Sequence, residues 1–197
     1  MNILASIVLL TNLAYSVAYD TETRCPCWVA YDLEPGEVVK AKRADIPFRA
    51  DPRVPESDNA ADYSGSGYDR GHMAPAADFN FDAAALKETY YYSNIAPQVP
   101  ALNRGAWLDA ENEIRRLAAS GTVHVVVWPE YHSYQTNRIG RVRVPIAFNK
   151  TAYGWFGLRC WRYNNVEWKS GFLGECETGK EAEPCTSSWL RWLWPWQ

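Results

Sequence analysis

The chain has 197 residues, of which 47% are hydrophobic and 14% aromatic, so it is long and apolar enough for one globular domain with a sizeable core. Its formal net charge is −3, which excludes the strongly basic composition of many nucleic-acid-binding domains. Any phosphate-binding surface must therefore be local.

The N-terminus supports two interpretations. An apolar run from Ile3 to Leu10 and a small-x-small site at residues 16–18 are typical of a secretory signal, although the segment lacks the usual Lys or Arg. In contrast, "LAYSVAYD" alternates like a core strand. We favour the uncleaved strand slightly, while a secreted or envelope location stays open. Asn12 interrupts the short apolar run and argues against a membrane-spanning helix.

The next segments predict a strand and then a long loop. "CWVAYDL" is the second strand, and "EPGEV" ends it. Residues 40–67 are rich in Pro, Asp, Ser and Arg and show no sustained periodicity. Long ordered loops in compact domains tend to be functional, so we expect this segment to border a site.

The middle of the chain predicts short elements around a polar motif and then a long helix. "GYDRGHMAPAADF" (67–79) is followed by a short helix near "DAAALKETY" and a strand at "YYYSNIAPQ". "LNRGAWLDAENEIRRLAASG" predicts one continuous helix, with Gly121 at its C-terminal cap. On that helix Asn103, Trp107, Glu111 and Arg115 would form a single stripe at i, i+4 spacing.

The remaining elements predict strands at "TVHVVVW", "GRVRVPIAF" and "GLRCWRY". The expected fold class is α+β, with a mixed or antiparallel central sheet flanked by helices. We interpret residues 1–197 as a single domain, with a core at about 13–165 and a tryptophan-rich C-terminal extension at 166–197. The extension is expected to cover a core face; docking a partner and inserting in a membrane interface are the alternatives.

The cysteines predict at most a partial set of disulfides. Five cysteines leave at least one unpaired within the chain. Cys176 and Cys185 flank a polar loop and would bridge in an oxidising compartment, whereas buried free thiols are the alternative. We assign no chemistry to the "CPC" segment, because its spacing fits neither a redox motif nor a zinc site.

The polar residues of the middle segment fit the hydrolysis of a phosphodiester. That reaction needs a base for water, a cation for the developing charge, and donors that hold the phosphate. His72 can be the base, Arg70 and Arg115 the donors, and Asn103 the seat of a hard cation. Mg²⁺ suits a seat with one protein oxygen because it keeps most of its water.

In order and spacing, "DRGHMAPAADF", "SNIAPQ" and "LNRGAWLDAENEIR" resemble the sugar-non-specific DNA/RNA endonucleases that include endonuclease G. The resemblance is specific over about residues 67–116 and weaker elsewhere. It implies a ββα-metal (His-Me finger) active site.

The resemblance also implies residue roles. His72 would be the general base, Asn103 the ligand to Mg²⁺, and Glu111 the residue that orders metal-bound water. Arg70 and Arg115 would contact the scissile phosphate. Mn²⁺ is the expected substitute metal. The remaining residues of the motifs are expected to support the site (Asp69 and Asn94) or to contact the nucleic-acid backbone (Arg104 and Arg116).

The expected substrates are DNA and RNA, held by their phosphates and sugars and cleaved to 5′-phosphate ends. Arg138, Arg141 and Arg143 could add local positive potential. A catalytically silent nucleic-acid- or partner-binding module with the same fold is the alternative function. A homodimer and an inhibitor protein are both compatible with the family, whereas a membrane partner is disfavoured.

Overall fold

A computed structural model describes residues 6–38, 45–131 and 137–166. Its main element is a six-stranded antiparallel sheet in the order β1-β2-β3-β6-β9-β10. The strands are β1 (Ile7–Thr11), β2 (Tyr15–Asp20), β3 (Cys25–Leu33), β6 (Val123–Glu130), β9 (Ala147–Gly154) and β10 (Gly157–Asn164). The predicted α+β class is confirmed.

Shorter elements join these strands. Two small ribbons are formed by β4 (Asp69–His72) with β5 (Ile95–Gln98), and by β7 (Arg138–Ile139) with β8 (Val142–Arg143). The helices are α1 (Ala60–Tyr63), α2 (Ala83–Glu88), α3 (Pro100–Asn103) and α4 (Ala106–Ala118), and the 3₁₀ turns are η2 (Pro55–Ser57), η3 (Ala76–Phe79) and η4 (Tyr92–Asn94).

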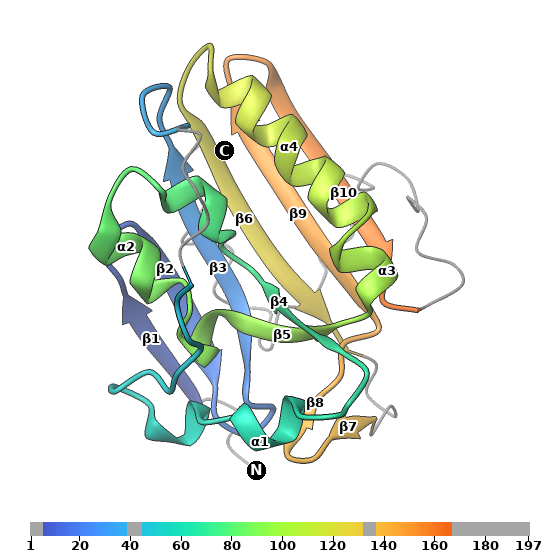
Figure 1. Cartoon of the computed structure of the whole chain (residues 1–197). Coiled ribbons are helices and arrows are strands. Elements are labelled where there is room, and N and C mark those ends of the chain that lie inside the picture. The colour runs from blue at the N-terminus through green and yellow to red at the C-terminus, as the bar shows by residue number, and fades with distance from the viewer. Residues whose placement is uncertain (1–5, 39–44, 132–136, 167–197) are drawn as a thin grey trace.

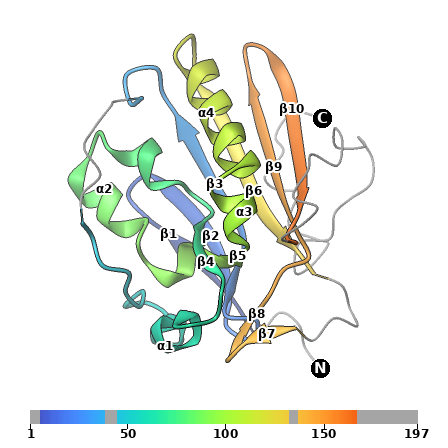
Figure 2. The same ribbon diagram turned by 45° about the vertical axis from the view of Figure 1, so that its right-hand side comes forward.

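One face of the sheet carries almost all of these elements. Helix α4 lies along β6, β9 and β10, whereas α2 and the β4–β5 ribbon lie over β1 to β3 (Figures 1 and 2). The buried residues of α4 recur every three or four positions, as expected of a helix with one face on a sheet: Trp107, Ala110, Glu111, Ile114, Leu117 and Ala118. The ribbon and α4 therefore lie over the same face of the sheet.

The N-terminal strand prediction is confirmed in its alternation. Tyr15, Val17 and Tyr19 are all buried in β2, and the end of the apolar run, from Ile7 to Leu10, lies in the edge strand β1. Ala18 lies within β2 and is itself buried. No helix among the described residues is long and apolar enough to cross a membrane.

The long predicted helix is two helices, which corrects the stripe predicted from its spacing. Helix α3 ends at Asn103, and α4 begins at Ala106 after Gly105, whose φ and ψ are −115° and −114°. A Cβ at Gly105 would lie 2.6 Å from the Ala101 carbonyl oxygen, so the sharp turn requires glycine. Asn103 therefore comes from a separate element, and only Trp107, Glu111 and Arg115 share a helix.

Other expected boundaries differ as well. Helix α4 ends at Ala118, and its C-cap is Ala119 and not the predicted Gly121. The segment predicted as a strand at 90–98 forms η4 and then the four-residue β5, and "GRVRVPIAF" divides into β8 and the start of β9. The predicted loop at 40–67 contains η2 and α1.

The thiol predictions are tested only in part. Cys25 is a buried free thiol, and burial raises its pKa to about 12. Cys27 and Cys160 take part in disulfides. The predicted Cys176–Cys185 bridge and nearly all of the tryptophan-rich extension lie outside the described residues.

Candidate active site

The β4–β5 ribbon presents the "DRGH" residues. Its antiparallel register pairs Asp69 with Gln98 and His72 with Ile95. A Cβ at Gly71 would lie 2.5 Å from Oε1 and 2.7 Å from Cβ of Gln98, whose side chain is fully buried. The absence of a side chain at Gly71 therefore lets Gln98 of β5 pack closely against β4.

Aromatic rings enclose the half-buried His72. The Phe48 ring centre lies 5.3 Å from the imidazole centre, and the Tyr90 ring meets the imidazole edge-on at 5.1 Å. Arg70, two residues earlier on β4, donates from Nε to the Tyr92 hydroxyl at 3.0 Å and lies over the Phe48 ring. These contacts limit the directions in which His72 and Arg70 can point.

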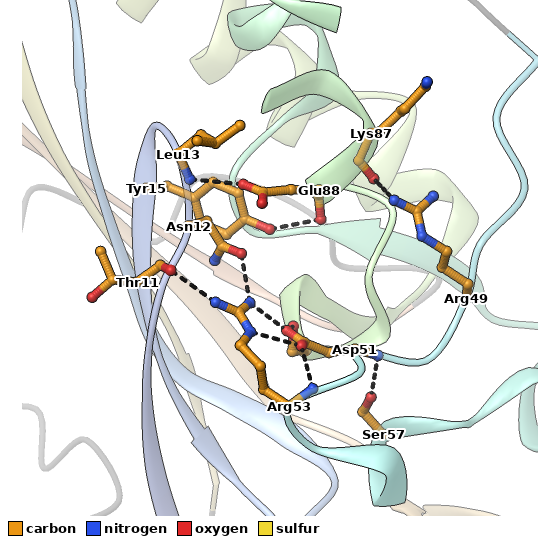
Figure 3. Close-up of polar contacts among 11 residues, drawn as sticks. Thr11, Asn12, Leu13, Tyr15, Arg49, Asp51, Arg53, Ser57, Lys87 and Glu88 are labelled. Atoms are coloured by element: carbon orange, nitrogen blue, oxygen red, sulfur yellow. Dashed lines mark hydrogen bonds and ion pairs between the residues drawn. The ribbon is translucent and has the colours of Figure 1, made fainter. Parts of the chain in front are cut away.

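Phe48 is held in place by the loop that follows it. Asp51 is completely buried and accepts two hydrogen bonds from the Arg53 guanidinium, at 2.8 and 2.6 Å (Figure 3). Ser93 donates to the same carboxylate, and Arg53 also donates to the Thr11 carbonyl. The loop is therefore fastened to the end of β1 and to η4.

Asn94 fixes the chain that leaves His72. Its Oδ1 accepts from the Ala74 backbone N–H, and its Nδ2 donates to the carbonyls of Ala74 and Thr89, each at 2.9 Å. The Met73 N–H donates to the Asn94 carbonyl at 3.0 Å. A fully buried asparagine with these bonds acts as a clamp on the segment next to the imidazole.

Asp69 joins the ribbon to α3. Its carboxylate accepts from Asn103 Nδ2 at 2.9 Å and from the Arg104 guanidinium at 2.8 and 2.6 Å. Burial would raise the pKa of Asp69, but the hydrogen bonds from Arg104 and Asn103 outweigh it and hold the pKa below the usual range. Because the Asn103 NH₂ group is engaged by Asp69, its carbonyl oxygen points the other way and is the end available to a cation.

A buried charge cluster lies between α4 and the sheet, and we define it as Asp78, Glu111, Arg115 and Lys150. Arg115 contacts Asp78 Oδ1 at 2.6 Å and Glu111 Oε2 at 3.9 Å, and Lys150 Nζ lies 3.6 Å from Glu111 Oε1. Tyr31 donates to the second oxygen of Asp78 at 2.9 Å. Two acids thus face two bases.

Burial dominates the protonation of this cluster. It raises the pKa of Glu111 and lowers the pKa of Lys150, and the charge of each partner opposes the shift of the other. Burial also raises the pKa of Asp78 against the opposing effect of Arg115. The charged forms therefore depend on one another for their stability.

Direct side-chain contacts join five of the predicted residues in two groups, whereas His72, Arg70 and Asn94 make the contacts described above. Asp69, Asn103 and Arg104 form one, and Glu111 and Arg115 belong to the other. Arg116 lies outside both: its side chain is 72% exposed and it faces Glu113 at 3.8 Å. Arg141 is engaged by Asp62 at 2.7 Å, and Arg143 lies over the Tyr131 ring.

Sequence reasoning missed Lys150, Asp78 and Phe48. The signal for Lys150 was a lysine inside the apolar strand "IAFNKTAY", at a position that alternation places on the same face as Phe148. Asp78 stood out only as an acid near His72. Phe48 had no signal, because its contact with His72 depends on how the long loop folds.

Comparisons with known proteins identify the family to which this sequence and fold belong. The sequence profile of the DNA/RNA non-specific endonuclease family matches residues 3–162. Human mitochondrial endonuclease G is 38% identical over 157 residues, covering 72% of this chain and 53% of its own. Mitochondrial nuclease 1 of Schizosaccharomyces pombe is 40% identical over 126 residues, covering 61% and 39%.

A solved structure of an EndoG/EndoGI complex, which concerns the mechanism of EndoG inhibition, shares the fold. It is 30% identical, with a TM-score of 0.73, and the match covers 80% of this chain and 74% of that chain. This chain spans about half the length of the human endonuclease G that it matches.

Proposed function

The chain belongs to the DNA/RNA non-specific endonuclease family, and from this premise we propose that it is a metal-dependent phosphodiesterase that hydrolyses DNA and RNA to 5′-phosphate ends. One observation carries the proposal most directly. The Asn103 amide is oriented by Asp69, with its oxygen turned away from the carboxylate, on the element that follows the His72 ribbon.

The described residues fit a hard cation that keeps most of its water. Among residues 6–38, 45–131 and 137–166, no group of three or more His, Cys, Asp and Glu could hold a metal. A cation at Asn103 would therefore have few protein ligands, a condition that suits Mg²⁺ and the similar Mn²⁺. When bound there, it would supply positive charge to the phosphate and to the departing oxygen.

His72 takes the role of general base in this mechanism. A neutral imidazole accepts a proton from the attacking water, and the rings of Phe48 and Tyr90 keep it aimed. Activity is expected to fall in acid, because a protonated imidazole cannot accept that proton. Arg70 and Arg115 hold the phosphate oxygens in the geometry needed for in-line attack.

Other residues bind the polymer or order the solvent. Glu111 accepts hydrogen bonds from water at the site, while Arg104 and Arg116 contact backbone phosphates from the exposed side of α3 and α4. Such contacts carry no base information, which agrees with a substrate range of both DNA and RNA. A homodimer, an inhibitor protein and the location of this chain stay predictions; the mitochondrial names of the relatives add an organelle to the locations to be tested.

The decisive experiment is digestion of supercoiled plasmid and of RNA with Mg²⁺, with Mn²⁺ and with a chelator. Wild type, His72→Ala and Asn103→Ala are compared with His124→Ala. His124 is an exposed histidine on β6 of the six-stranded sheet, where it pairs with Asp32 of β3. Cleavage of both polymers that requires metal, His72 and Asn103, and that survives in His124→Ala, supports the proposal. A folded wild type that leaves both polymers intact in either metal overturns it.

The chemistry of the ends is checked separately. Hydrolysis that expels the 3′ oxygen leaves a 5′ phosphate, which end-labelling detects after phosphatase treatment. Products with 3′-phosphate or 2′,3′-cyclic ends would contradict the assigned direction of attack.

A further inference from the structure

Lys150 is a lysine with no exposed surface, which is unusual for this residue type. Lys150 lies on β9. Because side chains alternate along a strand, it shares with Phe148 and Ala152 the face that α4 covers. Its ammonium group lies 4.1 Å from the centre of the Trp107 ring. The sheet therefore places a positive charge beneath α4, at the level of Glu111.

The two oxygens of Glu111 face different cations. Oε1 is 3.6 Å from Lys150 Nζ, and Oε2 is 3.9 Å from the Arg115 guanidinium. Arg115 is itself held by Asp78 at 2.6 Å. Lys150 thus approaches Glu111 from the rigid sheet, whereas Arg115 has a second acid to satisfy.

Stability alone does not account for a lysine at this position. A buried ion pair replaced by apolar residues of similar volume is often equally stable or more stable, because both charges lose their water on burial. An apolar side chain facing Trp107 and an uncharged residue at position 111 would fill the same space. The pair is better explained by what it does to the Glu111 carboxylate.

We propose that Lys150 is a positioning residue that acts through Glu111, by holding one oxygen of its carboxylate so that the group stays oriented toward water at the site. It also leaves Arg115 to Asp78 and to the phosphate, because without Lys150 a single guanidinium would have to balance two buried acids. This inference rests on the proposed nuclease function. It assigns a role to a residue that touches neither substrate nor metal.

The test compares Lys150→Met, Lys150→Gln, Glu111→Gln and the double variant Glu111→Gln/Lys150→Met with wild type. Lys87→Met is the matched control, because Lys87 is an exposed lysine on α2. Four quantities are measured for each protein: kcat and KM on a short duplex, the affinity for Mg²⁺ alone by calorimetry, and the thermal unfolding midpoint.

We expect Lys150→Met to lower kcat roughly 10- to 100-fold and to weaken Mg²⁺ binding, with KM little changed, as for other residues that orient the groups around a metal. The double variant should match Glu111→Gln, because Lys150 has nothing left to position. Lys87→Met should match wild type. Lys150→Gln keeps a donor and should retain more activity than Lys150→Met.

A purely structural role predicts different results. In that case Lys150→Met would lower the unfolding midpoint while folded protein kept its kcat, or the losses in the double variant would multiply; either result overturns the inference. If Lys150→Met does not fold, Lys150→Gln takes its place in the same comparison. If wild type shows no cleavage, the proposed function fails, and the affinity for Mg²⁺ then decides the inference: unchanged affinity in the lysine variants overturns it.

Discussion

The two regions that build the site hold their residues in opposite ways. On the β4–β5 ribbon, Asp69, Arg70 and His72 are half-buried, and they are fixed by backbone pairing, by the hydrogen bond from Arg70 to Tyr92 and by the exposed ion pair of Asp69 with Arg104. Between α4 and the sheet, Glu111 is buried and Lys150 fully so, and both are fixed by opposite charges.

The difference shows that groups that need access to solvent and groups that orient other side chains are held in different ways. A group that takes protons from water or contacts phosphate must meet solvent, so it needs neighbours that restrict it without covering it. Groups that only orient others, as Asp78 and Lys150 do in the charge cluster, can be fully buried, where each charge acts strongly but also requires a partner. Substitutions in the charge cluster should therefore affect stability most, and those at the exposed edge of the ribbon should affect it least.

The largest effect is expected for Asp78→Asn. Asp78 is fully buried and holds Arg115, so loss of its charge leaves two buried cations facing only Glu111. The free energy of unfolding should fall by about 3–5 kcal/mol, and cleavage should fall with the orientation of Arg115. Denaturant unfolding measures the first effect, and Asp109→Asn, at an exposed aspartate of α4, is the control. A loss no greater than that of the control would show that the cluster does not depend on its charges.

Asn94→Ala tests the clamp in the ribbon region. It removes three buried hydrogen bonds and leaves the Ala74 N–H and two carbonyls without their partner. We expect a loss of about 3 kcal/mol in the free energy of unfolding, and a loss of activity in the remaining folded protein because the chain after His72 is released. Circular dichroism and plasmid cleavage at a temperature where the variant is folded separate the two. Full activity under those conditions would mean that Asn94 serves stability alone.

Acid should affect the loop that carries Asp51 and the buried charge cluster with opposite sign. Burial raises the pKa of Asp51, but hydrogen bonds from Arg53 and Ser93 outweigh it and lower the pKa, so Asp51 contributes stability above its unfolded pKa of about 4 and loses it as the pH falls. The pKa of Glu111 is raised in the folded protein, so protonation of Glu111 as the pH falls increases the stability of the folded state. Unfolding of Asp51→Asn between about pH 5 and 3 should therefore show a weaker fall in stability than wild type. An identical slope in both proteins would remove Asp51 as a source of acid sensitivity.

The smallest effect on stability is expected for Arg104→Ala. The Arg104 side chain is 70% exposed, and a solvent-screened pair with Asp69 contributes little to folding. Nucleic-acid binding should weaken, with the slope of log affinity against log salt reduced by about 1 if Arg104 contacts a phosphate. Fluorescence anisotropy over a salt series measures this. An unchanged slope would mean that Arg104 does not contact a phosphate and serves only to hold Asp69.

Much of the local structure follows from the sequence. Alternation predicted β2, strand-forming runs of residues predicted β3 and β6, and helical patterning predicted α4. These predictions succeed because a strand or helix with one face on a core must repeat its apolar residues at the period of its backbone. The same patterns did not reveal the break at Gly105. Residues can stand at i, i+4 spacing in the sequence even where the helix between them is interrupted.

What the sequence by itself determined is the order and type of the reacting groups: "DRGH" with His72, an asparagine at 103, and an acid and a base one helical turn apart at Glu111 and Arg115. Only the tertiary structure decided that Phe48 packs on His72, that Asp69 turns the amide of Asn103, and that Lys150 reaches Glu111 from the sheet. Those contacts join residues about 20–40 positions apart along the chain, and such pairings depend on strand register, helix packing and loop anchoring, none of which a local pattern encodes.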